Sequence, residues 1–147
     1  MNRRRHALHR QRGLSLVEIL VAVVILSIGL LGLAGLQANS MRASQGSLYR
    51  AQAATLVADL AERMRTNLGD ARNYQHALGA APPAGTHVRA ADLADWLARV
   101  AALPAGRGAV SVNPSNTLVT ITVEWDDSRA GGPVNARHTT ETRLWNN

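Results

Sequence analysis

Cysteine and lysine are both absent from this chain of 147 residues, and aromatic residues make up only 3% of it. Without cysteine the protein has no disulfide, thiolate metal site or cysteine nucleophile. The length allows one small domain and an anchoring segment, and that domain must be held together by packing alone. The three tryptophans are therefore expected in its core or at an interface rather than in a ligand site: Trp96, Trp125 and Trp145.

Positive charge is concentrated at the N-terminus. The net charge is +6, and five of the 16 arginines precede Gly13, so that residues 14–147 carry 11 arginines against 10 acidic residues. An arginine-rich end can bind nucleic acid, but directly before an apolar segment it is typical of the cytoplasmic flank of a membrane span. We therefore expect a membrane partner and no nucleic acid.

A long apolar segment follows the arginines. Between Leu14 and Met41 the single ionisable side chain is Glu18. Residues 14–36 give an apolar stretch of about 23 residues, or roughly 34 Å of helix, which suffices for a hydrocarbon core of about 30 Å. The sequence therefore predicts one transmembrane helix over about 14–36, with the N-terminus in the cytoplasm and the rest of the chain translocated.

A secretory signal peptide is the nearest alternative. Its apolar core has about 7–15 residues and ends at a small-x-small cleavage site, which Gly32-Leu33-Ala34 would fit. The protein would then be a secreted soluble domain that begins at Gly35. The length of the apolar segment and the charge of Glu18 within it argue against this alternative.

Glu18 is the most informative residue of the sequence. A carboxylate at mid-bilayer costs on the order of 2.5–3.5 kcal/mol, and the span contains no arginine or histidine that would neutralise it. Cleavage just before Leu14 would create an α-amino group about one helical turn away, and a neighbouring subunit could bring its own amine to the same place. The alternatives are a carboxylate that reaches the interface unpaired and a single-span anchor that never polymerises.

The run Gly13-Leu14-Ser15-Leu16-Val17-Glu18, preceded by arginines, closely resembles the class III leader of type IV prepilins. The resemblance implies that a prepilin peptidase cleaves between Gly13 and Leu14 and methylates Leu14. It also implies that Glu18, the fifth mature residue, pairs with a neighbouring subunit's N-terminus during filament assembly. Leu14 departs from the phenylalanine that is commoner at this position.

Residues 29–37 and 58–67 look like the PilV group of minor pilins, and 103–106 and 123–127 fit its looser C-terminal pattern. This resemblance implies a non-enzymatic subunit that helps to initiate pilus assembly and supports twitching motility and adhesion. Its expected partners are other minor pilins, the major pilin, the assembly platform and the inner membrane, from which the subunit passes to the pilus. A pseudopilin of a type II secretion or DNA-uptake filament shares the leader and the long helix, and is the alternative.

Helical periodicity continues beyond the span. One apolar stripe recurs at spacings of three and four, which predicts an amphipathic helix over about 41–68 that Gly69 ends. The stripe consists of Tyr49, Ala53, Leu56, Leu60 and Met64. Asp59 and Arg63 form a favourable i,i+4 pair.

Three glycines, Gly29, Gly32 and Gly35, interrupt the apolar helix, and each costs up to about 1 kcal/mol relative to alanine. We interpret them as a softened segment that resembles the part of pilin helices that loosens in the filament. The alternative is that glycine is simply common in membrane helices.

The C-terminal part predicts an α+β head. Residues 70–88 read as a loop, and Asp92 is expected to cap a short helix with Leu93, Trp96, Leu97 and Val100 on one face. Strands are expected at 109–112, 118–126 and 138–145, with a turn at 113–116. The predicted fold is pilin-like, a long N-terminal helix on a small antiparallel sheet, with a leader at 1–13, the helix at 14–68 and the head at 69–147.

No catalytic, cofactor or metal site is expected. The histidines have no metal-ligand spacing: His6, His9, His76, His87 and His138. Asp126 and Asp127 are interpreted as part of a turn, with a calcium loop as the alternative. Arg107, Arg129 and Arg137 are expected on a solvated face, with a basic patch as the alternative.

Overall fold

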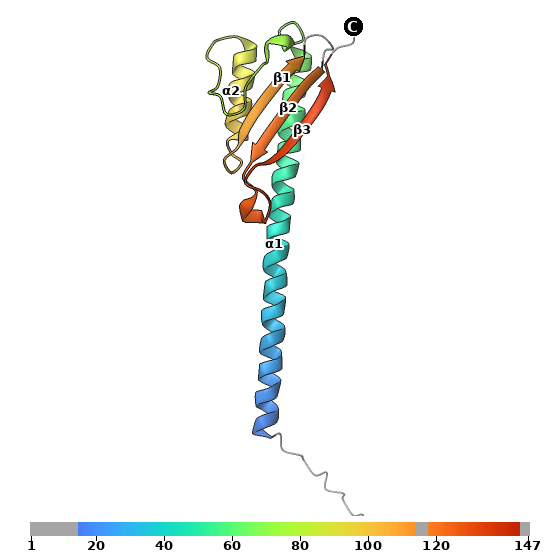
Figure 1. Ribbon diagram of the computed structural model, residues 1–147, viewed down its shortest axis with the longest axis vertical. Helices are drawn as coiled ribbons and strands as arrows, with labels where there is room; N and C mark the ends of the chain where they lie inside the picture. Colours follow the sequence, from blue (N-terminus) through green and yellow to red (C-terminus); the bar gives the residue numbers. More distant parts are fainter. Residues whose placement is uncertain (1–14, 114–117, 145–147) are drawn as a thin grey trace, which may run out of the picture. The chain divides into compact units, whose positions relative to one another are not determined.

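The computed structural model describes residues 15–113 and 118–144. Its architecture is the predicted pilin-like α+β fold, in which a long N-terminal helix packs against a three-stranded antiparallel sheet (Figure 1). The elements are α1 (Leu16–Thr66), η1 (Ala71–Asn73), α2 (Val88–Val100), β1 (Arg107–Asn113), β2 (Leu118–Trp125), η2 (Ser128–Ala130) and β3 (Ala136–Arg143). The chain divides into two compact units, residues 1–39 and 40–147. The predicted boundary between helix and head at 68/69 stays a prediction.

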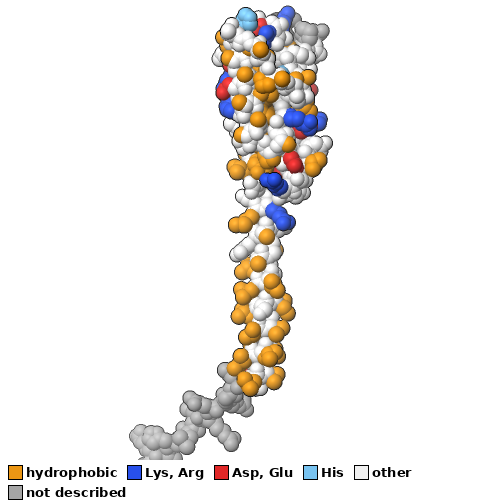
Figure 2. All heavy atoms as spheres, turned by 90° about the vertical axis from the view of Figure 1, so that its left-hand side faces the viewer, with side chains coloured by type: hydrophobic (Ala, Val, Ile, Leu, Met, Phe, Trp, Pro, Cys, Tyr) orange, Lys and Arg blue, Asp and Glu red, His pale blue; other side chains and the backbone are white. Residues whose placement is uncertain are grey.

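The described part of the first unit is the apolar beginning of α1. Every side chain from Ser15 to Asn39 is exposed, and apolar side chains cover this part of the helix on the face that Figure 2 shows. By length and composition α1 is suited to cross a membrane. The helix is regular through the three glycines, none of which has a neighbouring atom within 4 Å of an added Cβ. Their predicted softening in a filament stays a prediction.

The second part of α1 supplies one wall of the core in the unit 40–147. The predicted stripe is confirmed, because Ala53, Leu60 and Met64 are fully buried, Leu56 nearly so, and Tyr49 packs at the edge. The helix ends at Thr66, two residues before the predicted end. There the Asn67 N–H bonds to the Met64 carbonyl at 3.2 Å, an i→i−3 bond that tightens the last turn.

The sheet has the order β1-β2-β3, and its central strand carries the predicted alternation. Val119, Ile121, Val123 and Trp125 point into the core and are at most 2% exposed. The flanking strands exceed or shift from their predicted bounds, since β1 is longer than 109–112 and β3 lies two residues before 138–145. Most of the predicted turn at 113–116, together with Trp145, lies outside the described residues.

The prediction that Asp92 caps a helix is wrong. α2 begins four residues earlier, at Val88, so Asp92 lies within the helix, and the N-cap residue His87 makes no side-chain capping bond. The apolar face extends one turn back, to the buried Ala90, and this burial favours the earlier start. The predicted face is otherwise confirmed, with Leu93, Trp96 and Val100 buried and Leu97 partly so.

Residues 70–88 are also more structured than a loop, which corrects the prediction for this segment. η1 forms one 3-10 turn, and His76 then forms a β-bridge with Val110 of β1. The N–H and carbonyl of His76 bond to the carbonyl and N–H of Val110, each at 2.9 Å. Backbone polar groups of a segment packed against a sheet need such partners, and the bridge provides them.

Candidate functional site

Glu18 lies in the first turn of α1, and Ser15 immediately precedes this helix. The Ser15 hydroxyl accepts a hydrogen bond from the Val17 N–H at 3.3 Å, and the Ser15 carbonyl accepts one from the Ile19 N–H at 3.2 Å. This is the pattern of an N-cap residue. A carboxylate in the first turn is favoured by the helix dipole, so the start of α1 suits Glu18 locally.

The Glu18 carboxylate nevertheless has no partner within the part of the chain that the structure describes. It is exposed, and it accepts no hydrogen bond and forms no ion pair there. The next ionisable residue along α1 is Arg42. Gly13 and Leu14, the predicted cleavage and methylation positions, lie outside the described residues. Among the described residues the site is thus one unpaired acid on an apolar stretch of helix whose side chains are all exposed.

Two protein-family models match the chain on either side of residue 34. The prokaryotic N-terminal methylation motif matches residues 8–34, and the type IV pilin Tt1218 model matches residues 35–94. The two matches are contiguous and together cover residues 8–94, more than half of the sequence. The chain belongs to the type IV pilin family. No curated protein and no solved structure matches it.

This membership confirms the broader predictions. Type IV pilins are structural proteins and not enzymes, as expected. The match to the methylation motif spans Gly13, Leu14 and Glu18, and this motif implies processing by a prepilin peptidase. The roles of these three residues, and the closer resemblance to PilV-type minor pilins, stay predictions.

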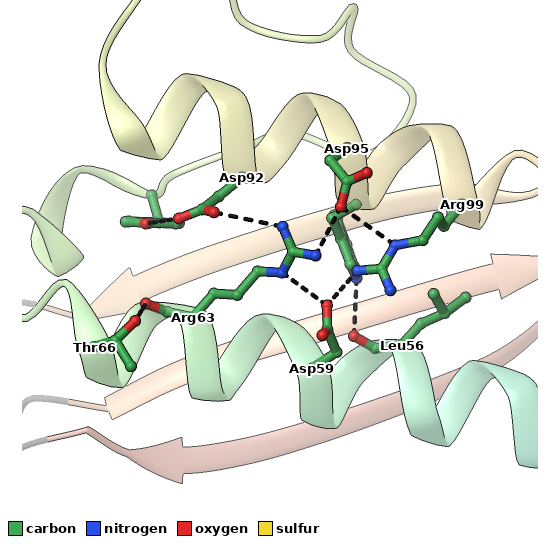
Figure 3. A network of polar contacts seen from close by, with 9 residues as sticks. Leu56, Asp59, Arg63, Thr66, Asp92, Asp95 and Arg99 are labelled. Atoms are coloured by element: carbon green, nitrogen blue, oxygen red, sulfur yellow. Dashed lines mark hydrogen bonds and ion pairs between the residues drawn. The ribbon is translucent and has the colours of Figure 1, made fainter.

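In this pilin, α1 and α2 are joined by a network of charged side chains (Figure 3). Arg63 forms the predicted pair with Asp59 at 2.9 Å, and it also bonds to Asp95 at 2.7 Å and Asp92 at 3.4 Å on α2. Arg99 of α2 forms salt bridges with Asp59 of α1 and with Asp95 of its own helix. Burial works against the Arg63 charge, but Asp59 and Asp95 outweigh it and raise the pKa of Arg63. The sequence revealed the pair within α1 and missed the acids on α2.

Tyr74 extends this network into the core. Its hydroxyl donates to Asp92 Oδ2 at 2.6 Å and accepts from Asn67 Nδ2 at 3.1 Å, while the side chain has no exposed surface. Burial, together with the hydrogen bond to Asp92, raises the pKa of Tyr74 to about 12. The Trp96 indole N–H donates to the Leu56 carbonyl of α1 at 3.0 Å. The buried aromatic residues therefore also fix α2 to α1 through polar contacts.

Arg107 and Arg137 converge on a buried acid that sequence reasoning missed. Both register partners of Glu124 in the sheet are arginines, Arg107 on β1 and Arg137 on β3, and both bond to its carboxylate. The Arg137–Glu124 distance is 2.7 Å. The basic patch considered from the sequence is thus partly neutralised, and its third member, Arg129, belongs to η2.

Asp126 and Asp127 form the predicted turn. Asp126 Oδ1 accepts the Ser128 N–H at 2.9 Å, and the hydrogen bonds from the Ser128 hydroxyl and N–H lower the pKa of Asp126. The Asp127 carbonyl accepts the Ala130 N–H at 3.0 Å and the Gly132 N–H at 2.9 Å. Within residues 15–113 and 118–144 no cluster of three or more histidines and acids could hold a metal ion.

The side chain of Asp127 turns away from solvent to α1. Its Oδ2 accepts a bond from Arg50 Nη2 at 2.9 Å, and its exposed fraction is 1%. Gly46 of α1 is buried at this contact, where an added Cβ would lie 3.3 Å from Ala130 Cβ. The η2 turn is thus attached to α1 by a salt bridge and a close glycine contact. Arg50 and Asp127 are 77 positions apart, and no short-range pattern relates them.

Proposed function

We propose that this type IV pilin is a PilV-like minor pilin that helps to initiate pilus assembly and thereby supports twitching motility and adhesion. The precursor is inserted in the inner membrane by α1, with a cytoplasmic leader at residues 1–13. A prepilin peptidase cleaves between Gly13 and Leu14 and methylates Leu14. The mature subunit, which consists of the long helix α1 and the head that follows it, then joins other minor pilins and the major pilin at the assembly platform.

The observation that carries this proposal is the unpaired charge of Glu18. The carboxylate lies in the first turn of an apolar helix, and no described residue neutralises it. In a hydrocarbon environment such a group is unfavourable by a few kcal/mol unless an opposite charge comes close. The new α-amino group of a neighbouring subunit would supply that charge, and subunits would then associate in the register that brings the amine to Glu18.

The absence of lysine permits a direct test of processing. With no lysine ammonium, the α-amino group is the only aliphatic amine of the chain, whether it is a free primary amine or an N-methylated secondary one, so a reagent that reacts with both kinds of amine labels the N-terminus alone. Mass spectrometry of the membrane-extracted protein should identify Leu14 as the first residue. A first residue of Gly35 would favour a secreted domain, and an intact leader would contradict the proposal.

Two substitutions separate processing from assembly. Gly13→Leu should block cleavage, so that the precursor accumulates. Glu18→Val should leave cleavage largely intact and abolish pili and twitching, because the neighbouring amine loses its counter-charge. Ser27→Val is the matched control, since within the described part of the chain the Ser27 hydroxyl bonds to the Val23 carbonyl of its own helix alone. Normal pili in the Glu18→Val strain would indicate a single-span anchor that does not polymerise.

A pseudopilin of a type II secretion or DNA-uptake filament remains the second candidate, because it would share the leader and α1. The resemblance of residues 29–37 and 58–67 to PilV-type proteins favours the pilus. Crosslinking in membranes followed by co-purification decides between the two. Recovery with pilus subunits supports the proposal, and recovery with secretion components contradicts it.

A further inference from the structure

The two edges of the sheet differ in how they are covered. β1 is protected by the preceding segment, because His76 bridges Val110 and the Gln75 side-chain oxygen accepts the Val112 N–H at 2.8 Å. β3 forms the other edge (Figure 1). It pairs with β2 on one side, and on the other side no strand or bridge from the described residues reaches it.

The open edge of β3 is long and regular. Its register with β2 runs without a bulge from Ala136 to Arg143, and it contains no proline, although Arg137, Glu141 and Arg143 give it charge. Natural proteins usually blunt exposed edges with bulges, proline, charged side chains, short strands or a covering segment. A long edge without a bulge or proline offers a row of main-chain donors and acceptors to an added strand whose charges complement its own.

A groove lies beside this edge, where the side chains of an added strand would point. It has a volume of about 190 Å³ and lies between α1 and β3. On the helix it is lined by the small side chains of Ala54, Ala58 and Ala61 together with Val57, Glu62 and Arg65, and on the strand by Thr140 and Thr142. The charged groups lie at one end, where Arg65 donates a hydrogen bond to Thr142 at 2.9 Å. The alanines leave room that longer residues would fill.

The face of β3 that points away from the groove indicates which charges an added strand would carry. Arg137, Thr139, Glu141 and Arg143 alternate there as exposed residues. Directly opposed residues of paired strands lie on the same face, and opposite charges stabilise the pair. An incoming strand therefore fits with an acid opposite Arg143 and Arg137, a base opposite Glu141, and small or branched apolar residues at the alternate positions.

We propose that the edge of β3 binds an extended segment of a different protein by antiparallel strand addition, with that segment's apolar side chains in the groove beside Ala58. A second copy of this chain does not fit this antiparallel arrangement. β3 is the open edge in the described part of the sheet, so two copies would pair β3 with β3, and antiparallel pairing would direct their α1 helices in opposite directions. This exclusion rests on the proposed function, in which all copies enter the same membrane.

The test uses the full-length chain in detergent and a labelled synthetic peptide, Glu-Val-Lys-Val-Thr-Val-Glu, which follows this pattern from Arg143 to Arg137. Fluorescence anisotropy should show saturable binding. A peptide with methyl groups on alternate main-chain nitrogens keeps the side chains but loses donors, and it should not bind. This peptide control needs no change in the protein.

Two protein variants locate the binding site. Ala58→Arg places a long side chain in the groove and should weaken peptide binding at least tenfold. Ala51→Arg is the matched control, because Ala51 is an exposed alanine of the same helix that does not line the groove, and it should bind as the original chain does. Unchanged tryptophan fluorescence and near-UV circular dichroism would show that both variants are folded.

Three results would overturn the proposal: no saturable binding, equal binding of the methylated peptide, or equal affinity of the two variants. A dimer of the full-length chain that is lost in Ala58→Arg would identify a second copy as the occupant and would also overturn it. None of these measurements involves Gly13, Leu14 or Glu18. Failure here therefore leaves the proposed function standing, and a normal pilus phenotype of Glu18→Val leaves the peptide result standing.

Discussion

Replacing Arg50 with alanine should destabilise the unit 40–147 strongly, although Arg50 itself is 60% exposed. The reason is that the substitution leaves the buried Asp127 carboxylate without its partner. Arg50 provides the one side-chain bond to the Asp127 carboxylate among the described residues, and Asp127 Oδ1 has no partner even in the original chain. Glycine backbone encloses the carboxylate, because an added Cβ would lie 2.3 Å from Oδ2 at Gly132 and 3.4 Å from Oδ1 at Gly46. Water therefore cannot easily replace the guanidinium.

The size of the effect follows from this burial. Removing one partner of a buried ion pair costs about 3–5 kcal/mol, because the other charge stays unpaired. Since the Arg50 side chain is partly hydrated, we discount this to about 2–3 kcal/mol of unfolding free energy. Against a typical domain stability of about 5–15 kcal/mol this is a large loss. It corresponds to a fall in Tm of roughly 10–20 °C for a unit of this size.

Changing Asp127 instead of Arg50 should lower the free energy of unfolding by less. Asp127→Asn removes the buried charge and keeps the shape, so we expect a loss of about 1 kcal/mol. The double variant should then be more stable than Arg50→Ala alone, because no charge is left unpaired. Trp96 and Trp125 are buried in this unit, so tryptophan fluorescence of the full-length chain in detergent reports its unfolding.

Arg42→Ala is the control for Arg50→Ala, since Arg42 is exposed on the same helix and a surface change of this kind usually has an effect within about 0.5 kcal/mol. The reasoning is refuted if Arg50→Ala is as mild as Arg42→Ala. It is also refuted if adding Asp127→Asn does not recover stability.

Two further predictions concern the core. The raised pKa means that folded Tyr74 keeps a proton that the unfolded chain loses above about pH 10, so its contribution to stability should be constant below pH 10 and fall by about 2 kcal/mol between pH 10 and pH 12. Tyr74→Phe should remove this alkaline loss in unfolding curves across that range, and an unchanged loss would contradict the assignment. Gly108→Ala should cost about 1–3 kcal/mol, because its Cβ would lie 2.4 Å from the Trp96 ring. Gly69→Ala, with open space around it, should show no such loss of Tm, and equal losses would argue against the close contact.

The sequence predicted the elements whose evidence is local. The stripe from Ala53 to Met64 and the alternation from Val119 to Trp125 each repeat with the period of one element, so they identified both the element and its buried face. The candidate site was equally visible, because a single acid in an apolar segment needs no tertiary knowledge to be noticed. What Glu18 does depends on a second subunit, and one chain cannot show it.

The errors lie where one residue can satisfy two patterns. Asp92 before an apolar stripe fits a helix cap, but its carboxylate bonds to Tyr74 and Arg63 instead, and these partners are 18 and 29 positions away. Glu124 reads as the polar half of an alternating strand, yet it is only 3% exposed, because arginines on both neighbouring strands bond to it. Such partners are set by the register of the sheet, which no short window of sequence specifies.

The contact of the η2 turn with Gly46 and Arg50 also has a mechanical consequence. Along α1, Gly46 is the first buried residue of the unit 40–147, and the next is Ala53. A pulling force that enters this unit through the N-terminal end of its helix therefore acts on the η2 turn before it reaches the sheet. Under rising tension the salt bridge would rupture first and the turn would peel from the helix, while the hydrogen bonds of the three strands were still intact.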